Sequence, residues 1–480
     1  MPKLQCVYRK IFCANIYPSI NQTFCNQKIN AQGGKSMSNK KIVTTLLSAF
    51  FVSSVVLSGC SSSTSSTATS APSEPAKANT ATEAPKAKKD PVSLTLAIWD
   101  KGQQAATEAI TAEFTKANPN ITVKVEVTPW DDYWVKRSAE ATSGTLPDVF
   151  WMHSGQFLKY ATGKFIAPLT DKVKSGDLDL NNYVSNLGNV YTLDGVPYAV
   201  PKDFDTIGLA YNKDLFQKAN IPFPDDTWDY NKLAEVAKKL TDASKGIYGF
   251  AAKADTQIGY WNDMLAFGGS ILSPDMKKSG YDSPESIAAL KQRYQMIVDK
   301  SSPTAQQMTD TDPREMFKSG KLAMMFEGSW QINDIYSSDI IKGKWDWAVL
   351  PKGPKTRGNI INGLGYSMSA AGKHQDEAWL LTKFLGSKQA AQIFAEKGAA
   401  IPAFKDTQDA WLKSKPDLNL KIFPQQAKEA TPYPAGSKSY PVWFTKESQI
   451  MAPAFGGKQS IEDAAKAVAK AMNDAIAAEK

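Results

Sequence analysis

The alternation of apolar residues after residue 94 is the feature that most constrains the fold. Residues 94–98 alternate as a strand does, residues 106–114 place apolar side chains on one helical face, and residues 121–127 alternate again. A strand, a helix and a strand within roughly thirty residues form a βαβ unit, which requires a parallel sheet and a right-handed crossover. Residues 147–152 predict a further strand. The fold class is therefore α/β.

Helix starts are marked by hydroxyl side chains that can accept a hydrogen bond from a free N–H group. We predict caps at Thr227 for a helix over Tyr230–Thr241, at Ser283 ahead of Pro284, and at Ser460 for the last helix.

Length and composition indicate a soluble globular protein of more than one domain. A chain of 480 residues is too long for a single core, and its mean hydropathy is −0.35. The net charge is +8, but the residues before Cys60 contain seven basic side chains and no acidic one, which leaves +1 for the rest. We therefore expect no nucleic-acid partner.

Cysteine and histidine are too few for most metal or redox chemistry. The four cysteines are Cys6, Cys13, Cys25 and Cys60, so none lies in the globular part, and the only histidines are His153 and His374. These counts argue against a disulfide framework, a cysteine metal site and histidine-dependent catalysis, and we expect no metal and no cofactor.

The segment before the globular part is typical of a secreted lipoprotein. Lys40 and Lys41 precede an apolar run over 42–57, which ends in Leu57-Ser-Gly-Cys60. This sequence resembles the lipobox of bacterial lipoproteins, which implies a signal peptide over 37–59 and a lipid on Cys60; an uncleaved signal anchor is the alternative. Residues 1–36 precede this signal, and our hypothesis is a misassigned start with Met37 as the true initiator.

A tether follows the lipid-attachment site. Residues 60–91 are rich in Ser, Thr, Ala, Pro and Lys and cannot form a core. As a flexible coil the tether would reach about 30 Å, enough to hold a domain just off a membrane.

Several ordered motifs resemble one family. They are Gly208-Leu-Ala-Tyr-Asn-Lys-Asp-Leu-Phe216 within 195–228, the run Phe317–Trp330, the run Ile361–Ser369 and the helix Glu377–Leu385. Together they resemble the bacterial extracellular solute-binding proteins of family 1, the sugar-binding receptors of ABC importers. The resemblance extends from Leu94 to the C-terminus.

The resemblance implies a two-lobe periplasmic-binding-protein-like fold with hinge crossings and a ligand cleft between the lobes. We expect an N-terminal lobe of 92–206 plus 364–388, a C-terminal lobe of 207–363 plus 389–480, and crossings near Thr206–Gly208, Ile361–Gly363 and Gly386–Ala390. The receptor would be a monomer, would catalyse no reaction, and would bind a carbohydrate, of oligosaccharide size, for delivery to ABC permease subunits. Its place would be the outer face of the cytoplasmic membrane in a Gram-positive organism, or the periplasm in a Gram-negative one, with the lipid as its only membrane attachment.

Sugar sites combine aromatic platforms with carboxylate and amide groups. For three of the candidate ligand residues a structural role is the alternative: a helix cap for Asp100, which follows the first strand, core packing for Trp151, and a part in the hinge alone for Asn362. Either Tyr260 or Trp261 could stack on the ligand. For Trp443, packing is the favoured role. The residues that the resemblance places at the ligand are Asp100, Trp151, His153, Asp205, Tyr260, Trp261, Glu327, Trp330, Asn362 and Trp443.

Two other functions remain open from the sequence. A lipid-anchored glycoside hydrolase would need two carboxylates across a scissile bond, and Asp100, Asp205 and Glu327 could supply them. A surface carbohydrate-binding adhesin is the other, although it does not explain the hinge motifs. No hydrolase sequence motif is present.

Overall fold

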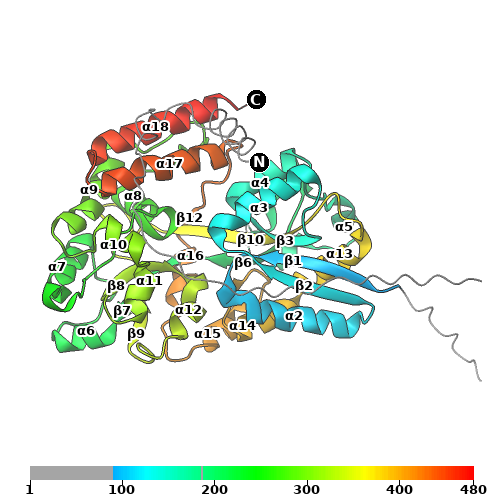
Figure 1. The fold of residues 1–480 in the computed structure, drawn as a ribbon, viewed down its shortest axis with the longest axis horizontal. Coiled ribbons are helices and arrows are strands. Elements are labelled where there is room, and N and C mark those ends of the chain that lie inside the picture. The colour runs from blue at the N-terminus through cyan, green and yellow to red at the C-terminus, as the bar shows by residue number, and fades with distance from the viewer. Residues whose placement is uncertain (1–89, 185–186, 480) are drawn as a thin grey trace, which may run out of the picture. The chain divides into compact units, whose positions relative to one another are not determined.

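The computed structural model describes residues 90–184 and 187–479 (Figure 1). The predicted signal peptide, Cys60 and nearly all of the tether therefore lie outside the described residues. Within the described part, no helix is both long enough and apolar enough to cross a membrane.

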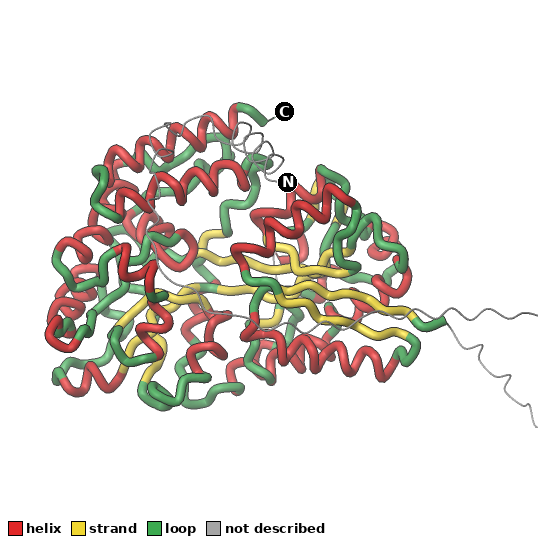
Figure 2. The backbone as a smooth tube through the Cα atoms, viewed as in Figure 1, coloured by secondary structure: helices red, strands yellow, loops and turns green. Residues whose placement is uncertain are grey.

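The first sheet contains the predicted βαβ unit. Its strand order is β11-β6-β10-β3-β1-β2, with β12 paired to β10. Strands are drawn yellow in Figure 2. Strand β1 is parallel to β2 and β3, as predicted, whereas β10 runs antiparallel to β3 and β6. The bounds are β1 Val92–Ile98, β2 Ile121–Val127, β3 Val149–His153, β6 Val200–Asp205, β10 Ile360–Met368, β11 Ile401–Pro402 and β12 Thr431–Pro432.

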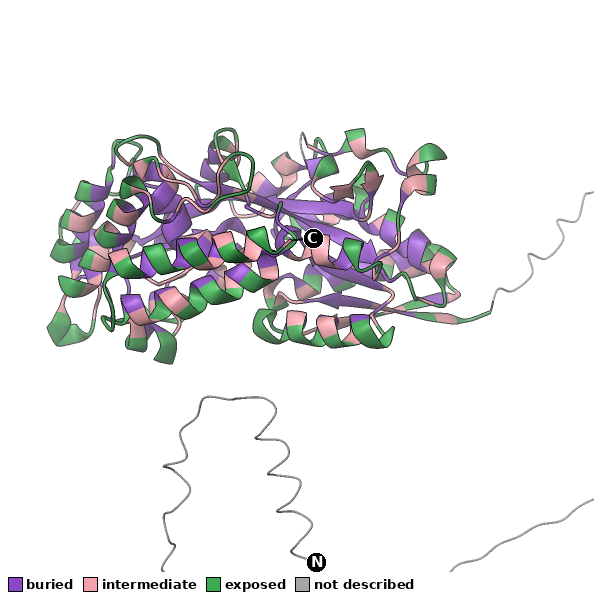
Figure 3. Ribbon diagram, turned by 90° about the horizontal axis from the view of Figure 1, so that it is seen from above, coloured by how far each residue is buried: buried purple, intermediate pink, exposed green. Residues whose placement is uncertain are grey.

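Successive side chains along each strand point to opposite faces of this sheet, and different helices cover the two faces. Leu94 and Leu96 belong to a core with α2 and α13, whereas Ala97 and Phe150 belong to a core with α3 and α4. Both faces are thus covered, and the strands are buried between layers of partly exposed helices (Figure 3). The helices and short strands around this sheet are η2 Lys101–Gln103, α2 Gln104–Ala117, α3 Trp130–Ser143, α4 Ser154–Thr162, α5 Thr170–Lys174, η3 Leu180–Asn182, η4 Leu187–Asn189, β4 Thr192–Leu193, β5 Val196–Pro197, α13 Gln375–Leu385 and α14 Lys388–Glu396.

A second sheet follows in the order β8-β7-β9, with both pairs antiparallel. Its strands are β7 Ile207–Asn212, β8 Met324–Gly328 and β9 Trp345–Ala348. Apart from α13 and α14, the helices that follow β7 in the chain are α6 Lys213–Lys218, α7 Tyr230–Leu240, η5 Ala243–Lys245, η6 Thr256–Tyr260, α8 Trp261–Phe267, α9 Pro284–Val298, α10 Ala305–Asp310, α11 Pro313–Lys318, η7 Ser329–Gln331, α12 Ile332–Tyr336, α15 Gln408–Lys413, α16 Ile422–Ala427, α17 Tyr440–Phe455 and α18 Ile461–Ala477.

Two strands carry the chain between the sheets. Strand β6 of the first sheet ends at Asp205 and β7 of the second sheet begins at Ile207, so a single residue, Thr206, separates the two strands. The chain returns to the first sheet through β10, and Asn359 immediately precedes that strand. The side-chain amide of Asn359 joins the two crossings, because it donates to Ile207 O (2.8 Å) and accepts from Ile207 N (3.0 Å).

The structure differs from the expected third crossing near Gly386–Ala390. Helix α14 packs against α2, and β11 pairs with β6, so residues 388–402 stay with the first sheet. The reason is the apolar face of α14, where Ala390 and Phe394 are buried in the core that contains α2.

Two of the three predicted caps are confirmed, and one is wrong. Ser283 and Ser460 cap α9 and α18 through their side chains. Helix α7 is capped by Asp229, whose Oδ1 accepts from Lys232 N (2.7 Å), and not by Thr227. Thr227 instead belongs to the preceding turn, where its own N–H donates to Asp225.

The C-terminal helices form a core of their own with α8 and α9. At its centre lies Glu447 of α17, a fully buried residue whose Oε1 accepts from Tyr260 Oη (3.1 Å) and Trp261 Nε1 (2.9 Å). Its Oε2 has no hydrogen-bond partner among the described residues. Burial raises the pKa of Glu447 to about 8, so the carboxyl is largely protonated at neutral pH.

We expect Glu447→Gln to reduce the pH dependence of folding stability. A folded-state pKa above the unfolded value of 4.5 means that the folded chain holds the proton more tightly, so this group's contribution to stability falls as pH rises from about 4.5 through about 8. Glutamine can accept the same two hydrogen bonds and does not ionise. The measurement is denaturant unfolding of wild type and variant between pH 5 and 9.

The matched control is Glu462→Gln in α18. Ion pairs with Lys466 and Lys291 lower the pKa of Glu462 to about 2, so its contribution is lost only in acid, below the window tested. Equal slopes for wild type and Glu447→Gln across this window would contradict the assignment.

Candidate functional site

Aromatic side chains gather where the parallel strands of the first sheet end. Trp99 follows β1, Trp130 follows β2 and opens α3, and His153 ends β3. The Trp99 ring lies 5.3 Å from Trp130 and 5.9 Å from Trp134, and Trp130 lies 5.2 Å from His153. We call these four residues the aromatic corner. Trp130 is its most exposed member, at 37%, and the carboxyl ends of parallel strands are where open α/β sheets place ligands.

His153 and Asn362 lie together, as parts of adjacent strands. Asn362 of β10 places its amide between His153 Nε2 (2.7 Å) and Ser154 Oγ (2.6 Å). His153 Nδ1 accepts from Gly155 N (3.1 Å), which caps α4. Burial lowers the pKa of His153 to about 3, so the ring is neutral and serves as a hydrogen-bonding and packing group.

Asp100 lies beside the aromatic corner and caps a short helix. Its carboxylate accepts from Gly102 N (2.7 Å) and Gln103 Nε2 (3.0 Å), so the alternative role considered for it is present. Burial raises the pKa of Asp100, and these hydrogen bonds oppose the rise. Gln103 in turn accepts from Lys202 Nζ (2.9 Å), which links Asp100 to a buried cation.

The side chain of Lys202 covers the ring of Trp151, which is not accessible to a ligand. The Lys202 ammonium is paired with Asp203 and lies 4.0 Å from the centre of the Trp151 ring. The indole of Trp151 is fully buried, with its edge toward Trp99 at 5.1 Å. Trp151 is therefore packed in the core, which was the alternative role considered for it, and it contacts the Trp99 ring.

Asp205, the last residue of β6, receives a hydrogen bond from Gln257 of η6. Gln257 Nε2 donates to Asp205 Oδ1 (2.7 Å), which joins the end of the first sheet to the segment before α8. Burial first, and the charge of Asp203 second, raise the pKa of Asp205 well above its usual range. Asp205 is thus a buried carboxyl that accepts a hydrogen bond from the other sheet's side of the chain.

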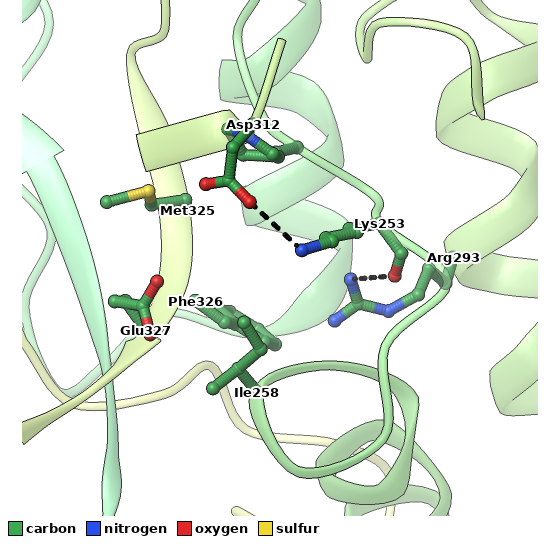
Figure 4. Close-up of a pocket in the computed structure, with 9 residues that line it drawn as sticks. Lys253, Ile258, Arg293, Asp312, Met325, Phe326 and Glu327 are labelled. Atoms are coloured by element: carbon green, nitrogen blue, oxygen red, sulfur yellow. Dashed lines mark hydrogen bonds and ion pairs between the residues drawn. The ribbon is translucent and has the colours of Figure 1, made fainter. Parts of the chain in front are cut away.

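Glu327 is the penultimate residue of β8 and lines a pocket in the second lobe. Residues Lys253, Ile258, Asp312 and Phe326 line the same pocket (Figure 4), and Lys253 Nζ donates to Asp312 Oδ2 (3.2 Å). The Glu327 carboxylate accepts from Gly328 N (2.8 Å) and lies 3.6 Å from Arg314 Nε. Burial raises the pKa of Glu327 to about 7 despite the opposing charge of Arg314.

Trp330 lies in η7, two residues after the end of β8, and is half-buried. A Cβ atom at Gly328 would lie 2.1 Å from the Trp330 ring, so glycine at position 328 is what allows the indole to lie against the backbone. Part of the ring packs on the core of the second sheet, and the rest is accessible. This arrangement suits a platform for an apolar ligand face.

The remaining three predicted residues lie in the C-terminal core. Tyr260, Trp261 and Trp443 are each 1% exposed or less. Tyr260 and Trp261 donate to Glu447, and Trp443 Nε1 donates to Ser437 Oγ (3.2 Å). In this arrangement all three support helix packing and none presents a ring to solvent.

Sequence reasoning missed Trp130, Trp134, Gln257 and Arg314. Trp130 could have been found, because it follows the second strand as Trp99 follows the first, and the same rule about strand ends applies to both. Gln257 and Arg314 have no such signal, because their roles depend on contacts between elements far apart in the chain.

The described residues hold no group of three His, Cys, Asp or Glu side chains that could bind a metal ion. The polar groups of the site are instead carboxyls, an amide and a guanidinium beside partly exposed indoles. Such a set binds a ligand through hydrogen bonds and apolar contact.

The fold is that of a solute-binding protein. The family model for bacterial extracellular solute-binding proteins matches residues 99–392. The chain belongs to this family, which confirms the resemblance seen in the motifs.

Individual relatives agree with this assignment. The galactooligosaccharide-binding protein of Bacillus subtilis (strain 168) is 25% identical over 401 residues, which cover 80% of this chain and 90% of the relative. The maltotriose-binding protein of Pyrococcus abyssi is 25% identical over 348 residues, 70% of this chain and 71% of the relative. An ABC substrate-binding protein from Listeria monocytogenes, solved in complex with cycloalternan, has a TM-score of 0.76 at 23% identity, covering 81% of this chain and all of that one. The two-lobe α/β fold class is thereby confirmed.

We expect Trp330→Ala to weaken solute binding about tenfold or more while changing the melting temperature of the free protein little. The ring is half-exposed, so its removal leaves a small cavity, whereas lost stacking and apolar burial act directly on the bound solute. Calorimetric titration and thermal unfolding of one sample measure both effects.

The control is Trp379→Ala in α13, a residue that is 4% exposed in the core of the first sheet. Its loss should cost about 3–5 kcal/mol of folding stability with little effect on binding by the folded fraction. Early unfolding of Trp330→Ala with native affinity would make Trp330 a structural residue.

Proposed function

We propose that this chain is the lipid-anchored receptor of an ABC importer and binds a carbohydrate, of oligosaccharide size, between its two lobes. The observation that carries this proposal is that each lobe holds a partly exposed indole and a carboxyl at the end of a strand. On one lobe the Trp130 ring lies 5.3 Å from Trp99, which directly precedes Asp100, and on the other Trp330 lies three residues after the buried Glu327. Sugar rings have apolar C–H faces and a hydroxyl rim, which these two kinds of group satisfy. The names of the relatives from Bacillus subtilis and Pyrococcus abyssi support an oligosaccharide ligand.

The ligand-binding residues that we propose are Asp100, His153, Asp205, Glu327, Trp330 and Asn362, to which we add Trp130. Trp151, Tyr260, Trp261 and Trp443 would support them from the core. The receptor would do no chemistry on its ligand. A solute that contacts both lobes has higher affinity for the closed form and shifts the population toward it, and a permease would recognise that form.

A saccharide panel tests this proposal. A ligand that binds only folded protein, at about a hundred times its dissociation constant, stabilises by roughly 2.7 kcal/mol, which raises the melting temperature by several degrees. The panel should include mono- and oligosaccharides, with amino acids, peptides and metal chelates as controls. A response only to the controls would disprove carbohydrate binding.

The same incubations distinguish a receptor from a glycoside hydrolase, for which Glu327, with its pKa of about 7, would be the candidate acid. A receptor returns each saccharide unchanged after prolonged incubation, as chromatography would show. Shortened products that disappear in Glu327→Gln would favour the hydrolase.

We expect Cys60→Ser to release the protein from the membrane fraction or to stall its processing, because Cys60 is the only acylation site that the sequence offers. Membrane fractionation and the mass of the mature chain measure this. Mature Cys60→Ser protein that remains wholly in the membrane fraction would contradict the lipid anchor.

A further inference from the structure

The first turn of α4 approaches α17 without an intervening side chain. A Cβ atom placed on Gly155 would lie 2.4 Å from Cε1 and 2.5 Å from Cζ of Tyr440. Gly155 belongs to the first lobe, immediately after β3, and Tyr440 opens α17 in the helical core of the second lobe. The Tyr440 ring therefore rests on the backbone of the opposite lobe, and only glycine leaves room for it.

The Tyr440 ring is held in place from the side of the second lobe. It is stacked on Phe444 with ring centres 5.0 Å apart and an interplanar angle of 23°, and Trp443 packs against it at 4.9 Å. Its exposed fraction is 1%. A ring packed in this way cannot turn aside to admit a methyl group, so an added Cβ at position 155 would push the two lobes apart.

A second tyrosine connects this contact to the hinge and to the candidate site. The hydroxyls of Tyr433 and Tyr440 lie 2.5 Å apart, and Tyr433 N donates to Ile361 O of β10 (2.9 Å). The Tyr433 ring meets His153 edge-on at 4.9 Å and 89°. His153 is a member of the aromatic corner, so Tyr433 reaches from the hinge strand to the wall of the proposed cleft.

The position of the contact determines its effect on binding. Gly155 lies at the carboxyl edge of the first sheet, two residues after His153, on the side where the aromatic corner is found. A contact between the lobes on the ligand side can exist only when the lobes are close together. It therefore adds to the stability of the closed form and not of an open one.

We propose that the contact of Tyr440 with Gly155 stabilises the closed arrangement of the lobes, which makes both of them positioning residues for ligand binding. This inference rests on the proposed function only for the kind of ligand, a saccharide, that is used to measure affinity. Neither residue needs to touch the ligand. Their effect on affinity comes from the population of the closed form, because apparent affinity falls in proportion to the fraction of molecules able to close.

Gly155→Ala tests the proposal with little change in local backbone preference. Position 155 is in the first turn of α4, where alanine is at least as favourable as glycine. We expect at least tenfold weaker affinity for whichever of maltotriose, mannotriose or galactooligosaccharide raises the melting temperature of the wild type. We also expect a larger radius of gyration in X-ray scattering, with a melting temperature of the free protein close to the wild-type value.

Gly163→Ala is the matched control, because it lies at the other end of the same helix. A Cβ atom there would meet the Phe165 ring at 2.4 Å, within the first lobe. It should lower stability and leave affinity and radius of gyration unchanged. Tyr440→Leu is a second route to the same loss of contact, and it should weaken binding in the same direction as Gly155→Ala.

Native affinity and native radius of gyration in a folded Gly155→Ala or Tyr440→Leu protein would overturn the proposal. If the wild type binds a different kind of solute, the carbohydrate assignment fails, and titration with that solute still decides whether the contact supports closure. If it binds nothing in the panel, scattering of the free proteins decides: a larger radius for Gly155→Ala supports the contact, and an equal radius overturns it.

Discussion

The side chain of Asn359 makes the interaction on which the two-lobe arrangement depends. Its amide pairs with both the N–H and the C=O of Ile207, so the strand that leaves the first sheet is tied to the strand that returns. Gln426 Nε2 donates to the same carbonyl (2.9 Å), which adds the later segment to this junction. Strands joined at one point can bend there but cannot slide past each other, so the lobes should move as bodies about a hinge.

The candidate site is divided so that neither lobe is complete without the other. Trp130 and Asp100 follow parallel strands, whereas Glu327 and Trp330 lie at and just after the end of an antiparallel strand. Each half combines an accessible ring with a carboxyl whose burial raises its pKa. A ligand that bound both halves of the proposed site would gain its contacts only on closure, and occupancy would in this way be coupled to the arrangement of the lobes.

Local patterns predicted most of the elements, and contacts between distant elements decided the rest. Strand alternation located β1 and β2, and hydroxyl caps located α9 and α18, because both signals are contained within a few residues. The predicted cap of α7 was Thr227, but the cap in the structure is Asp229, because Thr227 belongs to the preceding turn. Either Tyr260 or Trp261 was predicted to stack on the ligand, and no local pattern shows that Glu447, far along the chain, accepts a hydrogen bond from both of them.

The buried carboxyls of Asp205, Glu327 and Glu447 have a consequence for the thermodynamics of folding. Burial raises the pKa of each one, to about 7 for Glu327 and about 8 for Glu447, so at these two groups the native chain binds protons near neutral pH that the unfolded chain would release. Folding is therefore linked to proton uptake. The heat of unfolding measured in a calorimeter should include the ionisation enthalpy of the buffer that accepts these protons, and it should differ between phosphate and Tris at the same pH.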